Sequence, residues 1–235
     1  MQPIRIATRD EWLAARLGLL AGEKAETRMR DENRARRREL PGVPVEADYR
    51  FMTPRGEQSL AELFEGRSQL IVYHHMLKPN DPAPCAGCSM VGDHIPHLAH
   101  INARDVTLVF VARAPSPEIE RYKRRMGWTM PFYQSIDSFG SDFGIDGGFG
   151  LNVFLNTDAG IMRTYYTSGR GVETLGTPMT LLDITPFGRQ ETWEESPEGV
   201  AQGEPYVWWR RHDEYDPHPS APSAVARQMP QRASG

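Results

Sequence analysis

The sequence predicts a mixed α/β domain, because apolar runs of strand length alternate with segments of helical character. Residues 69–77 (QLIVYHHML) and 106–112 (VTLVFVA) are candidates for buried strands, and residues 151–156 and 161–167 flank a short turn as a hairpin. The connection between the first two runs is long enough for a helical crossover. We therefore expect a parallel pair of strands extended by an antiparallel hairpin.

The composition is that of a globular protein and excludes several classes of partner. Of the 235 residues, 39% are hydrophobic and 25% are charged. The net charge of −4 provides no basic field for a nucleic acid, and no run approaches the roughly 18 apolar residues of a membrane span. The N-terminus has no apolar signal region. We therefore expect a cytoplasmic protein with neither nucleic-acid nor membrane partners.

The first predicted element is a long helix over residues 8–39, within an N-terminal extension at 1–44. Thr8 and Glu11 have the spacing of a capping box, and a Pro-Gly pair follows the run. The apolar residues that can share one side of this helix are Trp12, Leu13, Leu17, Leu20, Ala25 and Met29. This pattern predicts a helix that packs on the domain or joins two copies in a homodimer.

The α/β domain is predicted over residues 45–190. Its expected elements, in chain order, are a hairpin and short helix from residue 49, the strand at 69–77, a helix over 86–100 broken at Pro96, the strand at 106–112, a helix from Ser116 to Gly127, the hairpin at 151–167 and a helix within 172–182. This order places helices between the strands, so we expect a central mixed sheet flanked by helices.

An irregular C-terminal extension follows the domain. Residues 191–216 are predicted to dock on the domain, because Trp208 and Trp209 can bury large aromatic areas. His212 and the acidic residues after it offer metal ligands as an alternative. The Pro- and Ser-rich stretch at 217–235 is predicted to be a disordered tail.

The chain has two cysteines, in the motif Cys85-Ala-Gly-Cys88, directly after the first buried strand. A predicted helix begins there, and the free N–H groups at a helix N-terminus stabilise a thiolate. The spacing allows the second thiol to reach the first. In a reducing compartment a CxxC motif indicates catalysis or metal binding. We predict that Cys85 attacks a substrate disulfide and that Cys88 resolves the mixed disulfide.

The order of elements resembles the thioredoxin fold over roughly residues 45–185. The phrases LFEGRSQLIVYHHM, CAGCS, INARDVTLVFVARAP, YKRRMGWTMPFY and WWRRHDEYD are also similar to an uncharacterised bacterial family of thioredoxin-like proteins, described as predicted dithiol–disulfide oxidoreductases. The resemblance implies a disulfide-containing protein or small thiol as substrate and an external electron donor. It implies no cofactor.

The resemblance also implies a substrate-binding proline. Thioredoxin-like proteins place a cis-proline opposite the dithiol, where the chain enters the final hairpin, and Pro131 is the best candidate here. Met130 would then line the substrate groove. Pro84 occupies the position before the first cysteine, where thioredoxins have an aromatic residue, and it is the third predicted substrate-binding residue. The insertion QSIDSFGSDFGIDGGFG, which follows Pro131 and precedes the hairpin, is a candidate cover for the site.

Three alternatives to disulfide exchange stay open. Cys85, Cys88, His94 and His97 could hold zinc, although their spacing is not that of a zinc finger, and the two thiols alone could bind a soft metal such as copper; we assign no metal site. Peroxiredoxins share the fold, but they favour threonine three residues before the attacking cysteine, where this chain has Pro82. A non-catalytic binding domain would keep both thiols as buried apolar groups.

The paired histidines of the first strand have two interpretations. His74 and His75 are neighbours, so their side chains face opposite sides of the sheet. One of them could approach the dithiol and accept a proton from Cys88. A hydrogen-bonded structural role is the interpretation we favour for both.

Overall fold

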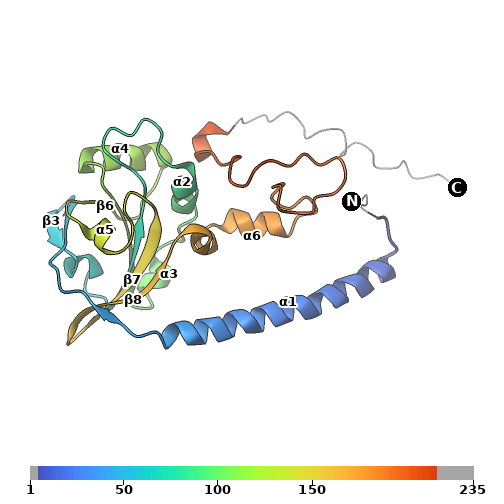
Figure 1. Ribbon diagram of the computed structural model, residues 1–235, viewed down its shortest axis with the longest axis horizontal. Coiled ribbons are helices and arrows are strands. Elements are labelled where there is room, and N and C mark those ends of the chain that lie inside the picture. Colours follow the sequence, from blue (N-terminus) through green and yellow to red (C-terminus); the bar gives the residue numbers. More distant parts are fainter. Residues whose placement is uncertain (1–4, 216–235) are drawn as a thin grey trace.

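The computed structural model describes residues 5–215 and contains one mixed sheet (Figure 1). The predicted tail at 217–235 lies outside the described residues. The strands are β1 (Val43–Pro44), β2 (Arg50–Thr53), β3 (Gly56–Ser59), β4 (Gln69–His74), β5 (Val106–Ala112), β6 (Phe132–Ser135), β7 (Gly150–Thr157) and β8 (Gly160–Thr167). Their order across the sheet is β1-β8-β7-β4-β5-β6-β2-β3.

The helices lie between and after these strands. They are α1 (Arg9–Arg38), α2 (Ala86–Asp93), α3 (Ala99–Asn102), α4 (Ser116–Met126), α5 (Phe139–Asp142) and α6 (Thr177–Asp183), with 3-10 turns η1 (Glu62–Phe64), η2 (Gly169–Leu175) and η3 (His212–Glu214). The predicted helix over 86–100 is thus two helices. α2 ends at Asp93, three residues before Pro96. A proline disfavours helical backbone angles in the residue before it, so the helix cannot continue through this point.

The predicted pairing of the central strands is confirmed. β4 and β5 are parallel, with Tyr73 opposite Phe110, and α2 and α3 form the crossover between them. β7 pairs antiparallel with β4 and continues into the β7–β8 hairpin. A strand, a helix that starts with CxxC, a parallel strand, a helix, and a final antiparallel hairpin followed by helical turns make a thioredoxin-like α/β fold.

Two apolar clusters cover the opposite faces of this sheet. Alternate residues of β5 divide between them, with Leu108 and Phe110 in one cluster and Val109 and Val111 in the other. The first cluster also contains Cys88 and the buried side of α4, and the second contains a set of phenylalanines. The CxxC motif therefore begins a helix that is anchored in the core.

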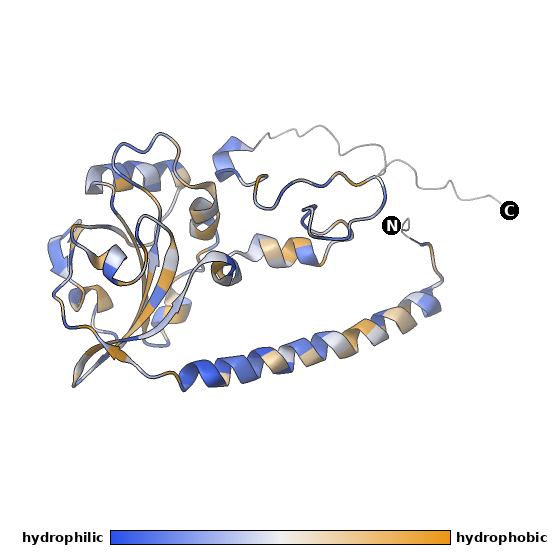
Figure 2. Cartoon of the chain, in the orientation of Figure 1, coloured by the Kyte–Doolittle hydropathy of each residue, from blue (hydrophilic) through white to orange (hydrophobic). Residues whose placement is uncertain are grey.

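α1 stands apart from the domain in Figure 1, and none of its residues is buried. The predicted capping box at Thr8 and Glu11 is present. Figure 2 shows that the N-terminal half of α1 is the more hydrophobic half, and the side chains of Trp12 and Leu17 are 60% and 56% exposed. At the other end, the Arg37 guanidinium lies 4.6 Å from the centre of the Tyr165 ring of β8. Within residues 5–215, no helix combines the length and the apolar character needed to cross a membrane.

A candidate thiol site at the start of α2

Cys85 and Cys88 lie at the first turn of α2, directly beyond the carboxyl end of β4. Cys85 is the N-cap residue, and its Sγ accepts a hydrogen bond from the backbone N–H of Cys88, with an N–S distance of 3.4 Å. Both are free thiols. Cys85 is half-buried, whereas Cys88 is only 2% exposed because it points into the core. The two sulfurs therefore differ in access to solvent.

The two thiols also differ in acidity. A hydrogen bond from the Cys88 thiol lowers the pKa of Cys85 to about 6, against the effect of burial, and the backbone N–H groups of Cys88 and Gly87 add to this. The same hydrogen bond and burial raise the pKa of Cys88 well above its ordinary value. At neutral pH the site thus holds one thiolate, Cys85, beside one protonated thiol.

Two tyrosines support this turn from inside the domain. The Tyr73 hydroxyl lies beside Cys88, and burial raises the pKa of Tyr73 well above its ordinary value, so the group is a neutral donor. Among the described residues, no group lies in hydrogen-bonding geometry with the Tyr73 hydroxyl. On the other side, Ser89 Oγ donates to the Cys85 carbonyl over 2.7 Å and lies 2.6 Å from the Tyr122 hydroxyl. These contacts hold the first turn of α2 in place.

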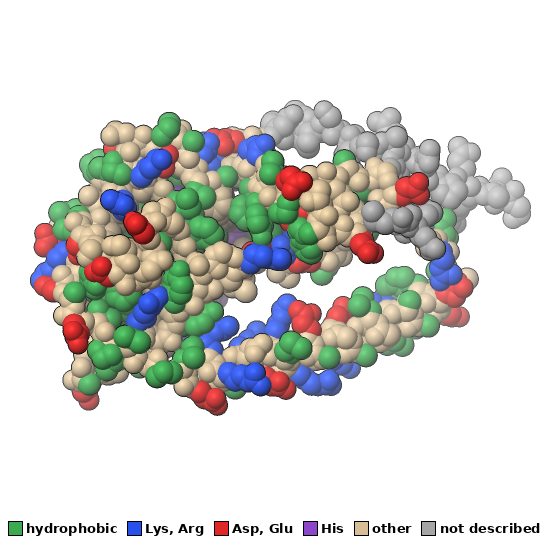
Figure 3. All heavy atoms as spheres, in the orientation of Figure 1, with side chains coloured by type: hydrophobic (Ala, Val, Ile, Leu, Met, Phe, Trp, Pro, Cys, Tyr) green, Lys and Arg blue, Asp and Glu red, His purple; other side chains and the backbone are tan. Residues whose placement is uncertain are grey.

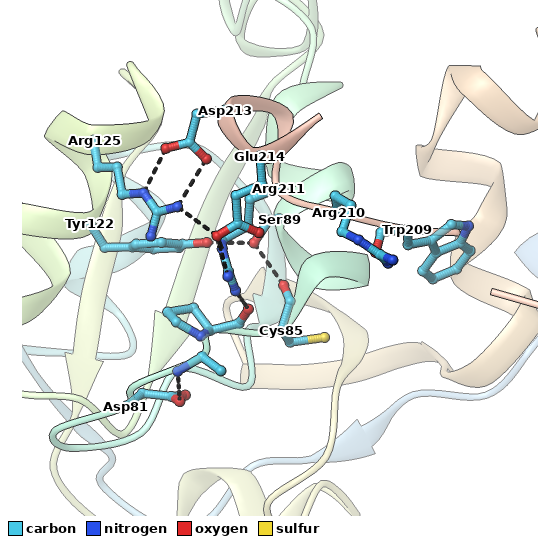
Figure 4. Close-up of polar contacts among 12 residues, drawn as sticks. Asp81, Cys85, Ser89, Tyr122, Arg125, Trp209, Arg210, Arg211, Asp213 and Glu214 are labelled. Atoms are coloured by element: carbon cyan, nitrogen blue, oxygen red, sulfur yellow. Dashed lines mark hydrogen bonds and ion pairs between the residues drawn. The ribbon is translucent and has the colours of Figure 1, made fainter. Parts of the chain in front are cut away.

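The C-terminal segment, residues 191–215, lies against the CxxC motif. A Cβ atom placed on Gly87 would be 2.6 Å from Cζ3 of Trp209, so this indole packs directly on the glycine between the cysteines. Arg211 Nη1 donates to the carbonyl of Pro84 over 2.5 Å. In Figure 4 the Cys85 sulfur points away from Arg211 and toward the side on which Trp209 lies. The segment that was predicted to dock on the domain thus contacts it at the CxxC motif, through Trp209 and Arg211.

Ion pairs fasten the end of the C-terminal segment to α4 (Figure 4). Arg125 of α4 makes two hydrogen bonds to Asp213, at 2.7 and 3.0 Å, and one to Glu214 at 3.0 Å. Arg211 also binds Glu214. These cations lower the pKa values of both carboxyl groups. The acidic residues after His212 thus bind arginine, and His212 itself contacts Asp93 at 2.8 Å.

A buried carboxylate organises the rest of the C-terminal segment. Glu191 is fully buried and accepts hydrogen bonds from Trp193 Nε1, Trp208 Nε1 and the Tyr206 backbone N–H, at 2.7, 2.9 and 2.8 Å. Burial acts to raise the pKa of Glu191, but these hydrogen bonds outweigh it and the pKa is lowered. The stabilisation they give is therefore present above the ordinary glutamate pKa and is lost as the pH falls through the lowered value.

Replacing Glu191 with alanine is expected to loosen this segment. Three donors in part-buried hydrogen bonds lose their acceptor, and a donor left unpaired costs up to about 1–3 kcal/mol when it is buried. Amide hydrogen exchange across residues 204–215 should accelerate by tenfold or more. Glu195→Ala, which removes an exposed carboxylate four residues away, is the matched control and should leave exchange unchanged. If the amide groups of residues 204–215 exchange at the same rate in the two variants, Glu191 does not have this structural role.

A cavity of about 360 Å³ lies between α2 and the C-terminal segment. Both cysteines line it, together with Gly87, Tyr73 and Trp209. Phe149 reaches it from the residue before β7, and η2 and α6 close the opposite wall. A molecule in this cavity would contact the Cys85 sulfur directly. The arrangement can therefore hold a substrate beside a thiolate, with a second thiol one helical turn behind.

A family model described as a bacterial protein of unknown function (DUF899) matches residues 1–215. The chain belongs to the DUF899 family. The matched range includes the N-terminal helix, the CxxC motif and the C-terminal segment with Trp209 and Arg211. The DUF899 match thus agrees with the resemblance to an uncharacterised bacterial family. A search of curated proteins finds no match.

Solved structures similar to this DUF899 chain include redox proteins of low sequence identity. A putative thiol:disulfide interchange protein DsbE from Chlorobium tepidum is 14% identical, with a TM-score of 0.38, over 60% of this chain and 97% of that one. A putative thiol-disulfide oxidoreductase from Bacteroides vulgatus is 20% identical, with a TM-score of 0.38, over 59% and 96%. The mitochondrial 2-cys peroxiredoxin from Plasmodium falciparum is 14% identical, with a TM-score of 0.39, over 62% and 95%.

Pro131 and Met130 do not occupy the expected position. Pro131 precedes β6, which pairs with β5, and all peptide bonds of the described residues are trans. Met130 is buried in the core, and neither residue lines the cavity beside the cysteines. The reason is the additional strand β6, which the sequence pattern does not predict. It carries the chain to the far side of β5 before the final hairpin, so Phe149 precedes that hairpin instead.

The insertion after Pro131 lies mainly away from the thiols. Its residues Phe139 and Phe143 pack in the apolar cluster on the other face of the sheet. Only Phe149, at its end, lines the cysteine cavity. Pro84, by contrast, is at the site: it is buried next to Cys85, and its carbonyl is bound by Arg211. The cover that this insertion was a candidate to provide comes instead from the C-terminal segment.

The histidines are placed as structural groups. His74 stacks on Phe139 and contacts Asn152 at 3.1 Å, and His75 packs among aromatic rings on the opposite face. Burial lowers the pKa of both to about 3, so both are neutral. Across residues 5–215, no group of three or more histidine, cysteine, aspartate or glutamate side chains is arranged to hold a metal, and His94 instead contacts the Met90 carbonyl.

Proposed function

We propose that this protein is a thiol–disulfide oxidoreductase in which Cys85 attacks and Cys88 resolves. The observation that carries the proposal is the contrast between the two thiols. Cys85 is half-buried at a cavity and has a pKa of about 6, whereas Cys88 is buried behind it with a raised pKa. A thiolate is the nucleophile in disulfide exchange, so Cys85 is the group equipped to attack. Pro84 fixes the backbone immediately before it.

The reaction proceeds through a mixed disulfide. The Cys85 thiolate attacks one sulfur of the substrate disulfide, forms an S–S bond to it, and expels the other sulfur as a thiolate. Cys88 then loses its proton to solvent or to the departing thiolate and attacks the Cys85 sulfur. This step releases the second substrate thiol and leaves a Cys85–Cys88 disulfide. The substrate gains two electrons, and an external dithiol or similar donor returns them to the protein.

The lowered pKa of Cys85 also favours the reduced protein. At pH 7 a thiol with a pKa of about 6 is mostly ionised, which stabilises the dithiol state relative to two ordinary thiols. For a two-electron couple, this tenfold effect raises the reduction potential by about 30 mV. A cytoplasmic location, where free dithiols stay reduced, is part of the proposal.

A redox titration of the metal-free protein tests this function. Protein equilibrated in glutathione or dithiothreitol buffers would be alkylated, and intact mass would give the number of free thiols at each potential. We expect one transition in which both thiols disappear together, with no such transition in Cys85→Ser. If no intramolecular disulfide forms across the range of these buffers, the proposed function is wrong.

The acidity of Cys85 predicts the pH dependence of its alkylation. The thiolate forms as the pH rises, so the rate with iodoacetamide should increase through a midpoint near 6 and then level off. An ordinary cysteine would have its midpoint at about 8.5. Peptide mapping would assign the modified residue, and Cys88 should remain unmodified at pH 7. A midpoint for Cys85 above about 8 would remove the physical basis of the attack.

The proposal extends to a homodimer formed through α1. Trp12, Leu13 and Leu17 expose apolar side chains on this helix, and a second copy can cover them. Figure 3 shows hydrophobic side chains at the surface of α1. Sedimentation equilibrium should give twice the chain mass. Leu17→Glu should dissociate the dimer, whereas Ala15→Glu, at an exposed position on the opposite side of the same helix, should not. If the protein is a monomer at micromolar concentration, the proposed homodimer is wrong, and the proposed thiol–disulfide chemistry is unaffected.

A further inference from the structure

The cavity beside the cysteines is almost entirely apolar. Six side chains from five parts of the chain form most of its wall: Met90, Val91, Phe149, Val172, Met179 and Trp209. Figure 3 shows hydrophobic side chains where the C-terminal segment meets the domain. The volume of about 360 Å³ is within the range of small-molecule sites and is more than twice a cavity that holds benzene. The cavity therefore suits a compact apolar group of one or two rings.

The charged groups at the edge of the cavity contact each other. Arg170 and Glu173 are the charged residues that line it, and they form an ion pair with each other at 3.3 Å. Glu173 also binds Arg189 at 3.1 Å and accepts a hydrogen bond from the Tyr206 hydroxyl at 3.0 Å. A substrate with several charges, such as oxidised glutathione, would have to place them in a largely apolar space whose one carboxylate, Glu173, already has three partners.

The C-terminal segment restricts access by a polypeptide. An extended peptide needs backbone partners and open space beside the attacking sulfur. Here the Pro84 carbonyl is bound by Arg211, and the Trp209 ring packs on Gly87 between the two cysteines. The ion pairs of Arg125 with Asp213 and Glu214 hold this arrangement on α4. The route to Cys85 that remains leads through the apolar cavity.

We infer that the substrate of this site is a small, uncharged disulfide with apolar substituents, bound in the cavity between α2 and the C-terminal segment. The inference rests on the proposed function and narrows it. One substituent occupies the space against Met179 and Trp209, which brings its sulfur to Cys85. The Cys85 thiolate then takes that sulfur, the other half leaves as a thiolate, and attack by Cys88 frees the bound half as a thiol.

Binding is tested apart from redox chemistry with a substrate analogue that has no S–S bond. Diphenyl sulfide would be titrated into the full-length double variant Cys85→Ser/Cys88→Ser and followed by calorimetry. Met179 is 4% exposed and lines the cavity, whereas Leu181, two residues along α6, is 60% exposed. Adding Met179→Trp fills the cavity and should weaken binding at least tenfold. Adding Leu181→Trp introduces the same side chain outside the cavity and should leave binding unchanged.

A second variant guards against misfolding of Met179→Trp. Trp209→Ala enlarges the cavity without adding atoms, so it should improve binding of dinaphthyl sulfide relative to diphenyl sulfide. In proteins that keep both cysteines, kcat/KM for diphenyl disulfide should exceed that for oxidised glutathione and for insulin at least tenfold. Met179→Trp should remove this preference, while the midpoint of the Cys85–Cys88 redox transition stays where it was.

The outcomes separate the two proposals. If the Cys85–Cys88 disulfide forms but insulin or oxidised glutathione is the better substrate, the substrate class is wrong and the proposed function stands. Equal binding of diphenyl sulfide to the Met179→Trp and Leu181→Trp proteins would also overturn the substrate class. If no Cys85–Cys88 disulfide forms in the redox titration, the proposed function fails, and the inferred substrate fails with it.

Discussion

Replacing Cys88 with serine is expected to stop turnover and leave the substrate attached to Cys85. The Cys85 thiolate can still attack, because the backbone N–H groups at the start of α2 remain. Without the second sulfur, nothing behind the motif releases the mixed disulfide. Steady-state activity should fall at least 100-fold. Intact mass after one incubation with diphenyl disulfide or oxidised glutathione should show one substrate half per protein molecule.

The reciprocal variant is the control for this trap. Cys85→Ser keeps the buried Cys88, which is 2% exposed and has a raised pKa, so no adduct should form at pH 7. A reductant added to trapped Cys88→Ser protein should release the substrate half and restore the free thiol. Continued turnover by Cys88→Ser, or an adduct on Cys88 in Cys85→Ser, would contradict the assigned roles.

The local features of this site could be predicted from the sequence because they depend on neighbouring residues. The strand at Val106–Ala112 is one apolar run, and the structure has it with the predicted bounds. Gly127 ends α4 in a left-handed conformation, with φ of 64°, as expected for a glycine after a helix. The position of CxxC at a helix start followed from the strand before it. These signals lie within a few residues of the feature that they specify.

The arrangement around the cysteines depends on contacts that are distant in sequence. Arg211 binds Pro84 across 127 positions, and Arg125 binds Asp213 across 88. Arginines and acids are common on surfaces, so no local pattern identifies which pairs meet. The error at Pro131 has a related cause. β6 is four residues long and is specified by its parallel pairing with β5, which a short sequence window does not contain.

The contact between Trp209 and Gly87 leads to a second large effect. A methyl group at position 87 would lie 2.6 Å from the indole, closer than carbon atoms approach, so Gly87→Ala must displace the ring or strain α2. We expect a loss of about 1–3 kcal/mol in the free energy of unfolding, as for other overpacked sites. In a Trp209→Ala background the clash is absent. Alanine then favours the helix by up to about 1 kcal/mol over glycine, so the sign of the effect should reverse.

Urea unfolding of the four proteins in this double-mutant cycle gives the coupling between the two positions. Gly92→Ala is the matched control, because a Cβ there would lie 2.5 Å from Trp128, another indole that packs on α2. Gly92→Ala should therefore destabilise the protein equally with and without Trp209. Displacing Trp209 also uncovers the motif, so Gly87→Ala should raise the alkylation rate of Cys85 at pH 7 several-fold. An additive cycle with an unchanged alkylation rate would mean that Trp209 does not cover the motif, and the exclusion of polypeptide substrates would lose its structural basis.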